Sequence, residues 1–142
     1  MQLYQHKVNY YETDQMGVVH HSNYIRFMEE ARVHFFEQIG YGYDEMEKQG
    51  IISPVTAVEC KYKVSTYFAE VITISVSVEE FKGIKLKLRY EMRNKDNVVV
   101  SEGRSEHCFI DRDGRIIRMK KEYPQLHDLL VRLAEGEELE NA

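Results

Sequence analysis

The strongest pattern in the sequence is a stripe of apolar residues spaced as on one face of an α-helix. Its members recur every three or four residues: Tyr24, Met28, Ala31, Phe35 and Ile39, with Phe27 and Phe36 at its borders. We expect Ser22 or Asn23 to cap this helix at its N-terminus and Gly40 to end it. About 17 residues at about 1.5 Å each give roughly 25 Å, enough to cross a sheet of ordinary strands.

Four later segments alternate apolar and polar residues, which is the pattern of β-strands with one buried face. They cover residues 58–64, 72–78, 86–92 and 98–109. Short turns at 82–83 and 94–97 join consecutive strands, so the predicted sheet is antiparallel. A fifth strand is expected at Leu3–Tyr10, ahead of the long helix.

The remaining segments complete a single domain over residues 1–142. A short helix is expected at Asp44–Gln49, and an amphipathic helix at about residues 123–135 begins near Pro124. One face of the last strand has small side chains that suit a close helix: Val99, Ser101, Gly103 and Ser105. The predicted fold class is α+β, with a long helix wrapped by a five-stranded antiparallel sheet. The open edges of such a sheet favour self-association, so at least a dimer is expected.

Composition limits the possible functions. The 142 residues include 19 Lys and Arg against 24 Asp and Glu, and the net charge of −5 argues against a nucleic-acid-binding protein. No apolar run approaches the roughly 18 residues of a membrane span, and the N-terminus lacks a signal-peptide pattern. We therefore expect no membrane span and a cytoplasmic location. Cys60 and Cys108 lie in alternating segments without metal-type neighbours, so both are expected to be buried thiols.

The segment between the first strand and the long helix holds the candidate chemistry. Asp14 lies in a turn before the helix, where free backbone N–H groups and the helix dipole stabilise negative charge. A carboxylate beside such groups is suited to acyl transfer, because it attacks the acyl carbon or activates water while the amides hold the oxyanion. On residue type alone, however, helix capping is the simpler interpretation of Asp14.

Other ionisable residues indicate less. The adjacent pair His20–His21, with nearby carboxylates, could suggest a metal site, but neighbours in the chain seldom face one ion, and we predict no metal. Four isolated histidines are given no chemistry: His6, His34, His107 and His127. Basic residues on the polar strand faces either meet solvent or contact a phosphorylated ligand: Lys61, Lys63 and Arg89.

Residues 8–24 read VNYYETDQMGVVHHSNY, with Thr-Asp, a glycine three residues beyond the Asp, and His-x-x-Tyr. This run resembles the signature of the 4-hydroxybenzoyl-CoA thioesterase-like family of hotdog-fold proteins and is especially similar to the bacterial YbgC-type acyl-CoA thioesterases. The similarity continues through residues 27–32 and, more weakly, to about residue 115. The resemblance implies a long helix wrapped by a five-stranded antiparallel sheet, the same architecture that the periodicities predict.

The resemblance also implies roles for single residues. Asp14 matches the family's catalytic carboxylate, which acts as nucleophile or as general base toward water. The backbone N–H of His21 matches the amide that polarises the thioester carbonyl, while its side chain positions the loop or a water or transfers a proton. Gly17 matches a glycine that keeps the approach to the thioester open.

The family's substrate crosses a dimer seam, so the resemblance places the active site between protomers. Helix positions expected to build the helix and the subunit contact are Tyr24, Glu29 and Arg32, and Tyr24 is also a candidate substrate contact. The candidates for contact with the CoA phosphates are Lys61, Lys63 and Arg89. The expected assembly is a homodimer or a homotetramer.

The leading functional hypothesis is hydrolysis of an acyl-CoA thioester to a carboxylic acid and CoA, without a cofactor. A Gly-x-Ser-x-Gly motif is absent from the sequence. One alternative is a hotdog-type hydroxyacyl-thioester dehydratase that uses His21 and Glu29, although the residues around Asp14 argue against it. The other alternative is a non-catalytic protein that binds acyl thioesters.

Overall fold

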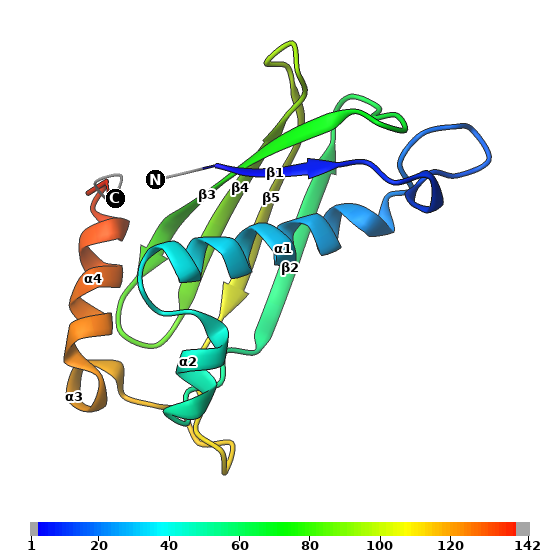
Figure 1. Ribbon diagram of the computed structural model, residues 1–142. Coiled ribbons are helices and arrows are strands. Elements are labelled where there is room, and N and C mark those ends of the chain that lie inside the picture. Colours follow the sequence, from blue (N-terminus) through cyan, green and yellow to red (C-terminus); the bar gives the residue numbers. More distant parts are fainter. Residues whose placement is uncertain (1–2, 139–142) are drawn as a thin grey trace.

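The computed structural model describes residues 3–138 and has the predicted α+β architecture (Figure 1). These residues form one antiparallel sheet with the strand order β1-β3-β4-β5-β2. The strands are β1 (Tyr4–Lys7), β2 (Val55–Tyr62), β3 (Val71–Phe81), β4 (Leu86–Arg93) and β5 (Val99–His107). The helices are α1 (Ser22–Gln38), α2 (Tyr43–Lys48), α3 (Met119–Glu122) and α4 (Pro124–Ala134), with a 3₁₀ turn η1 at Tyr10–Glu12.

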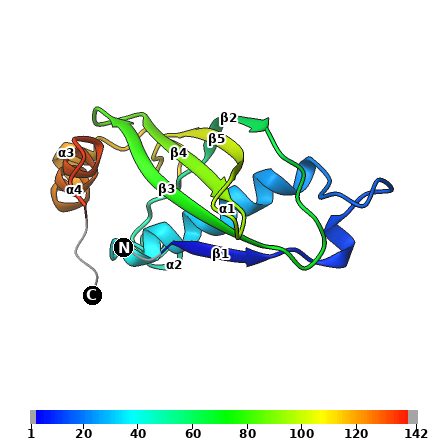
Figure 2. The same ribbon diagram turned by 90° about the horizontal axis from the view of Figure 1, so that it is seen from above.

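The long helix α1 runs across one face of the sheet, and the sheet curves around it (Figures 1 and 2). Its predicted apolar stripe is buried from Tyr24 to Phe36. Gly103 on β5 lies directly against this helix: a Cβ there would be 2.9 Å from Met28 Sδ and 3.1 Å from the Glu59 carbonyl oxygen. The predicted close approach of helix and strand is therefore confirmed, because only a residue without a side chain fits at Gly103.

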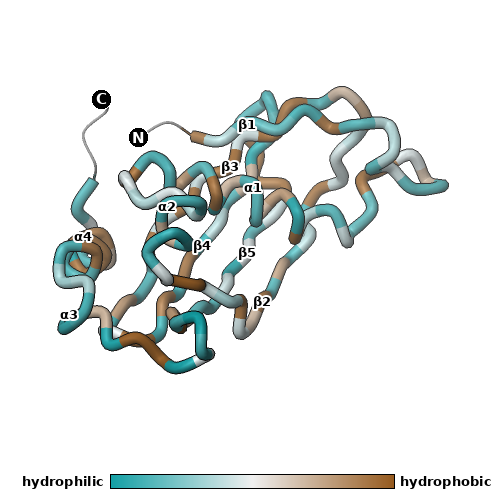
Figure 3. The backbone as a smooth tube through the Cα atoms, turned by 60° about the horizontal axis from the view of Figure 1, so that its bottom comes forward, coloured by the Kyte–Doolittle hydropathy of each residue, from teal (hydrophilic) through white to brown (hydrophobic). Residues whose placement is uncertain are grey.

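Apolar and polar residues alternate along β3 and β4 (Figure 3). The buried residues form an inner face toward α1, and the charged residues lie on the outer face. The buried inner residues are Ile72, Ile74, Val76, Val78, Leu86, Leu88, Tyr90 and Met92. On the outer face, Lys87 Nζ lies 3.2 Å from Glu80 Oε2 and 3.6 Å from Glu106 Oε1. The period-two pattern in the sequence thus corresponds to one face of the sheet in the core and one face in solvent.

The first strand is shorter than predicted. It ends at Lys7, and the chain then turns into η1 rather than continuing to Tyr10. The turn is stabilised because the backbone N–H of Asn9 donates to Glu12 Oε1 at 2.7 Å, in a capping box. Glu12, whose side chain stabilises the turn, lies five residues beyond the end of β1. Alternation of apolar residues alone therefore gave the wrong boundary for the strand.

The N-terminus of α1 also differs from the prediction. Neither Ser22 nor Asn23 caps the helix, and the N-cap position is His21, without a side-chain capping bond. The Ser22 hydroxyl is instead 2.8 Å from His20 Nδ1, and Asn23 Nδ2 donates to the Glu12 carbonyl at 2.9 Å. The expected cap residues are therefore used to fasten the preceding loop. The Ser22 N–H donates to His20 Nδ1 at 3.2 Å, whereas the His21 N–H has no acceptor among the described residues.

The C-terminal helix α4 confirms the amphipathic helix predicted at about 123–135, whereas the short α3 before it was not predicted. Strand β1 pairs with β3 only from Val71 to Ile74, and α4 packs against the longer remainder of β3 (Figure 2). Leu126 and Leu130 of α4 are buried there. The helix thus covers part of a sheet edge that β1 is too short to protect.

Strand β2 forms the opposite edge of the sheet and is exposed on both faces. Val58 and Tyr62 lie opposite the buried Ser105 and Ser101 of β5, yet their exposed fractions are 43% and 49%. Cys60, on the same strand, is only half-buried, as is Cys108, so the prediction of buried thiols is wrong. Within residues 3–138, no helix has the length and apolar character to cross a membrane.

Candidate functional site

Asp14 lies in a tight hairpin loop between η1 and α1, which projects from the body of the molecule (Figure 1). Thr13 and Val19 pair as an isolated antiparallel bridge at its base, and Asp14 N donates to the Val18 carbonyl at 2.8 Å. Asp14 Oδ1 accepts the backbone N–H of Met16 at 2.8 Å. Oδ2 accepts no hydrogen bond from residues 3–138, so one oxygen of this half-exposed carboxylate is available for chemistry.

Gly17 closes this loop with a left-handed backbone conformation, φ +82°. Its N–H donates to the Asp14 carbonyl at 3.0 Å, and a Cβ built on it would meet no described atom within 4 Å. The structure therefore gives a conformational reason for glycine at this position, because side chains disfavour positive φ. The predicted open approach to a thioester agrees with the empty surroundings of Gly17 and stays a prediction.

His21 stands at the start of α1, and its backbone N–H donates to no acceptor among the residues that the structure describes. Its carbonyl accepts the Tyr62 hydroxyl at 3.2 Å, which ties the helix start to the end of β2. The imidazole rings of His20 and His21 lie 4.2 Å apart, both on exposed residues. An unpaired N–H on the axis of a 17-residue helix is suited to bind a developing negative charge.

Glu12 fastens both ends of the Asp14 loop. The loop leaves Glu12 and returns at His20, whose N–H donates to the Glu12 carbonyl at 2.9 Å. Asn23 of α1 binds the same carbonyl. The Glu12 carboxylate is buried against His6 at 2.8 Å, so the expectation that His6 is isolated is wrong. The contact between His6 and Glu12 cannot be read from the sequence, because the two residues meet only where the chain turns at η1.

Tyr24 forms part of the wall beneath this region. Tyr24 is only 4% exposed, and its hydroxyl lies 3.0 Å from Thr66 Oγ1. The centre of its ring is 5.1 Å from that of Tyr62. Burial raises the pKa of the Tyr24 hydroxyl, so the group stays neutral in the physiological range. Tyr24 is thus placed by packing, and its proposed contact with substrate stays a prediction.

The three basic candidates lie on the outer face of the sheet, opposite the face that α1 covers. Lys61 and Arg89 line one small hollow with Arg104. Lys63 is paired with Glu102 at 3.1 Å, and Arg89 reaches Glu91 at 4.0 Å. These side chains are therefore grouped in space, but partly neutralised by neighbouring carboxylates.

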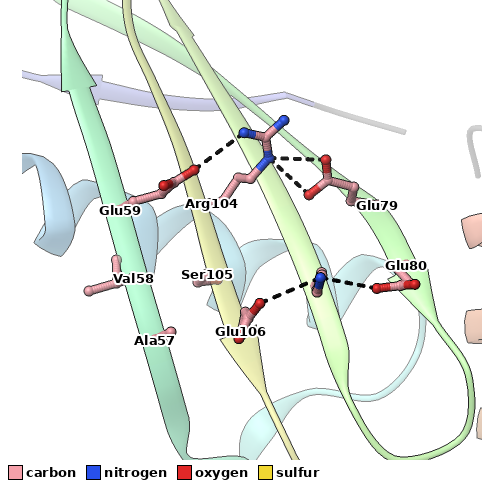
Figure 4. A pocket seen from close by; sticks show the side chains of 9 residues that line it. Ala57, Val58, Glu59, Glu79, Glu80, Arg104, Ser105 and Glu106 are labelled. Carbon is pink, nitrogen blue, oxygen red and sulfur yellow. Dashed lines mark hydrogen bonds and ion pairs between the residues drawn. The ribbon is translucent and has the colours of Figure 1, made fainter.

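A larger hollow of about 560 Å³ lies farther along the same outer face, between β2 and β3 (Figure 4). Arg104 spans it, bonded to Glu59 on one side and to Glu79 at 3.0 Å on the other. These hydrogen bonds raise the pKa of Arg104. The charges of this hollow satisfy one another, and neither Asp14 nor His21 lines it.

A second buried polar group was missed by the sequence analysis. Arg32 points into the interior, where Nε donates to the Tyr43 hydroxyl at 2.8 Å and Nη1 to the Tyr90 hydroxyl at 3.1 Å. The hydrogen-bond network continues from the Tyr90 hydroxyl to Ser105 Oγ at 2.6 Å, and from Ser105 Oγ to His107 Nε2 at 2.7 Å. Arg32 therefore joins α1 to the sheet within one chain, and its expected part in a subunit contact stays a prediction. His107 is not isolated, because it belongs to the same hydrogen-bond network.

Comparison with known protein families gives a match over most of the chain. A model of the thioesterase-like superfamily matches residues 8–135, which include the Asp14 loop, α1 and the whole sheet from β2 to β5. The chain belongs to this thioesterase-like superfamily. Membership confirms the predicted resemblance, the hotdog fold class and the prediction of an enzyme, a thioester hydrolase.

Three members of the family illustrate the relationship. The protein named "Putative acyl-CoA thioesterase YneP" from Bacillus subtilis strain 168 is 32% identical over 122 residues, 85% of this chain and 88% of the relative. The acyl-CoA thioesterase YbgC of Haemophilus influenzae is 28% identical over 90 residues, 62% of this chain and 66% of the relative. A structure described as a DHNA-CoA thioesterase from Staphylococcus aureus has a TM-score of 0.90 and 32% identity, covering 99% of this chain and 97% of that one.

Within residues 3–138, no group of three or more His, Cys, Asp or Glu side chains is arranged to bind a metal ion. The His20 ring bonds to Ser22, and the Asp14 carboxylate bonds to backbone N–H groups. What the region offers is a carboxylate and an unpaired amide.

Proposed function

We propose that this chain is an acyl-CoA thioesterase that hydrolyses its substrate to a carboxylic acid and free CoA with the Asp14 carboxylate. One observation carries the proposal: the loop that holds Asp14, with its unbonded Oδ2, ends at the unpaired N–H of His21 at the start of α1. The names of relatives that are acyl-CoA and DHNA-CoA thioesterases support a CoA ester as substrate.

The reaction needs a nucleophile and a site for negative charge. Asp14 either attacks the thioester carbon, giving an anhydride that water hydrolyses, or removes a proton from the water that attacks. In both routes the carbonyl oxygen becomes an oxyanion, which accepts the His21 N–H and is stabilised by the positive end of α1. The carbon–sulfur bond then breaks and CoA leaves as a thiolate, which needs little acid assistance.

We infer that the active site lies between two copies of this chain in a homodimer. The final assembly is this dimer or a tetramer made of two such dimers. The projecting Asp14 loop has little of this chain around it, and exposed apolar side chains lie on or near the β2 edge. These residues are Ile25, Val55, Val58, Tyr62 and Val64. A second copy seated on this edge would cover them and enclose the loop.

We further propose that Lys61, Lys63 and Arg89 contact the phosphates of the CoA arm. Lys61 and Lys63 flank Tyr62, whose hydroxyl binds His21, so the basic group lies beside the same end of β2 as the helix start. A phosphate group would replace Glu102 as the partner of Lys63, at little cost for an exposed pair. The location and charge of the three residues support this assignment.

The test is an Asp14→Asn substitution, assayed by thiol release from a panel of acyl-CoA esters. We expect kcat/KM to fall roughly 10²- to 10⁴-fold, because the amide neither attacks nor accepts a proton. Asp111→Asn is the matched control, since Asp111 Oδ1 also accepts two backbone N–H groups, at 2.9 Å each, in a distant loop. The control should keep wild-type activity.

Two other outcomes of these assays would assign a different function to the protein, and a third would assign the hydrolysis to a different group. Hydration of enoyl-CoA that survives Asp14→Asn and is lost in His21→Ala would identify a dehydratase. Tight binding of acyl-CoA without hydrolysis or hydration would identify a non-catalytic binding protein. Equal activity of Asp14→Asn and wild type in thiol release would show that another group performs the hydrolysis.

A further inference from the structure

His6 lies on β1, outside the Asp14 loop, and its ring is held between two carboxylates. Nε2 is 2.8 Å from Glu12 Oε1, and Nδ1 is 3.1 Å from Glu30 Oε2. The residue is 8% exposed, and its ring lies 4.2 Å from that of Phe27. Both ring nitrogens of a buried histidine therefore face acceptor oxygens from two different elements, η1 and α1.

Only the cationic ring satisfies both contacts. A neutral imidazole has one N–H donor and one lone pair, so either tautomer would place a lone pair against a carboxylate. The imidazolium ring donates from both nitrogens and forms two charge-assisted hydrogen bonds. With both carboxylates ionised, the two contacts therefore match a ring that donates from both nitrogens.

The other groups around the ring agree with this assignment. On β1, Tyr4 donates its hydroxyl to the same Glu30 oxygen at 3.0 Å, and burial together with that bond raises the pKa of Tyr4 to about 12. On β3, the residue paired with His6 is the apolar Ile72. The ring of His34 lies 5.5 Å from that of Tyr4, tilted by 51°. Glu12 and Glu30 thus supply two negative charges to one cation.

Glu12 connects this cation to the candidate active site. Its carboxylate binds His6, while its carbonyl oxygen accepts the N–H of His20 and the side-chain amide of Asn23. The first contact fixes Glu12 to β1, and the other two fix it to the start of α1. The Asp14 loop is suspended between these points, so the position of Glu12 sets where the Asp14 carboxylate lies relative to the His21 N–H.

We propose that protonated His6 is a positioning residue for thioester hydrolysis, which holds Asp14 in place through Glu12. The proposal rests on the proposed function of Asp14. When the His6 ring is replaced, the Glu12 carboxylate loses its contact with β1, and the Glu12 anchor loosens. Because a displacement of about 1 Å at a reacting group costs roughly a hundredfold in rate, a small shift of the loop lowers kcat. KM changes little, since His6 does not touch the substrate.

The kinetic test compares kcat and KM of wild type, His6→Gln and the control His127→Gln. His127→Gln should keep both wild-type values. The uncharged His6→Gln should show a kcat roughly ten- to a hundredfold lower, with KM within about twofold. Wild-type kcat in His6→Gln, or a loss that falls on KM instead of kcat, would overturn the proposal.

A spectroscopic measurement tests the proposal without a variant and without turnover. The ¹⁵N chemical shifts of the His6 ring should report hydrogen on both nitrogens at the pH of maximal activity. A neutral His6 ring at that pH would refute the role of the cation even if Asp14 is catalytic. Absence of acyl-CoA hydrolysis by wild type at every pH would instead refute the proposed function and leave the ring assignment standing.

Discussion

His107 is a residue whose environment differs greatly between the folded and the unfolded chain. It is 1% exposed on the inner face of β5, where Nε2 lies 2.7 Å from Ser105 Oγ and Nδ1 has no hydrogen-bond partner among the described residues. Burial, with a smaller contribution from the charge of Arg32, lowers the pKa of His107 from 6.5 to about 4. The folded protein therefore holds this ring neutral over a range where the unfolded chain protonates it.

The stability of the protein should depend on pH through His107. Between about pH 6.5 and about pH 4 the unfolded chain binds a proton that the folded chain does not, so stability is complete above this window and falls as the pH is lowered through it. The free energy of unfolding should decrease by about 3 kcal/mol at most across the window. Urea denaturation at a series of pH values measures this change.

His107→Gln removes the titration while keeping an amide that can bond Ser105. The variant should lose most of the slope between these pH values, although it is less stable than wild type above the window. If wild type and His107→Gln show the same slope, the acid sensitivity comes from other groups, and the neutral ring of His107 contributes nothing to it.

At the residue scale, the sequence predicts a side chain well where its role is local. The close packing at Gly103 follows from the small face of its strand. Gly17 is singled out only through the family resemblance, and its positive φ is known from the structure alone. The partners of His6 and His107 do not follow, because each pairs across elements that the chain brings together only on folding. Asp14 became a catalytic candidate through its motif, since on residue type alone helix capping is the simpler interpretation.

At the element scale, α4 completes the sheet on the side where β1 stops. Leu130 is fully buried and Leu126 nearly so, both on the helix that contacts β3. Leu130→Ala should lower the free energy of unfolding by about 2–5 kcal/mol, because it leaves a cavity between helix and sheet. Gln125→Ala, at an exposed position of the same helix, should change it by less than about 0.5 kcal/mol.

Thermal or urea unfolding of the two variants measures this difference. Equal stability of Leu130→Ala and Gln125→Ala would mean that α4 does not contribute to the folded core in solution. The periodicity of the sequence predicts α4 and α1 because each has a long apolar face. It places the end of β1 wrongly, since the stop comes from the Glu12 carboxylate rather than from a change in pattern.

At the scale of the whole molecule, the two edges of the sheet are covered to different extents. One edge is shared by β1 and α4, whereas β2 leaves its outer edge without a partner strand among residues 3–138. Val58 and Tyr62 also belong to the inner face of the sheet by their pairing, yet they stay 43% and 49% exposed, although the Tyr62 ring packs against Tyr24 of α1. An apolar inner surface that is open beside a free strand edge is the expected footprint of a second copy.

Val58→Lys tests this association, because a charge placed in the seam would be desolvated without a partner. Sedimentation velocity should give the mass of a dimer or tetramer for wild type and of a monomer for Val58→Lys. Ile84→Lys is the control: its side chain is 53% exposed, in the turn between β3 and β4, and the variant should keep the wild-type mass. If the site lies between protomers, Val58→Lys should also lose thiol release in proportion to its dissociation. A monomeric wild type with full activity would show that one chain alone encloses Asp14.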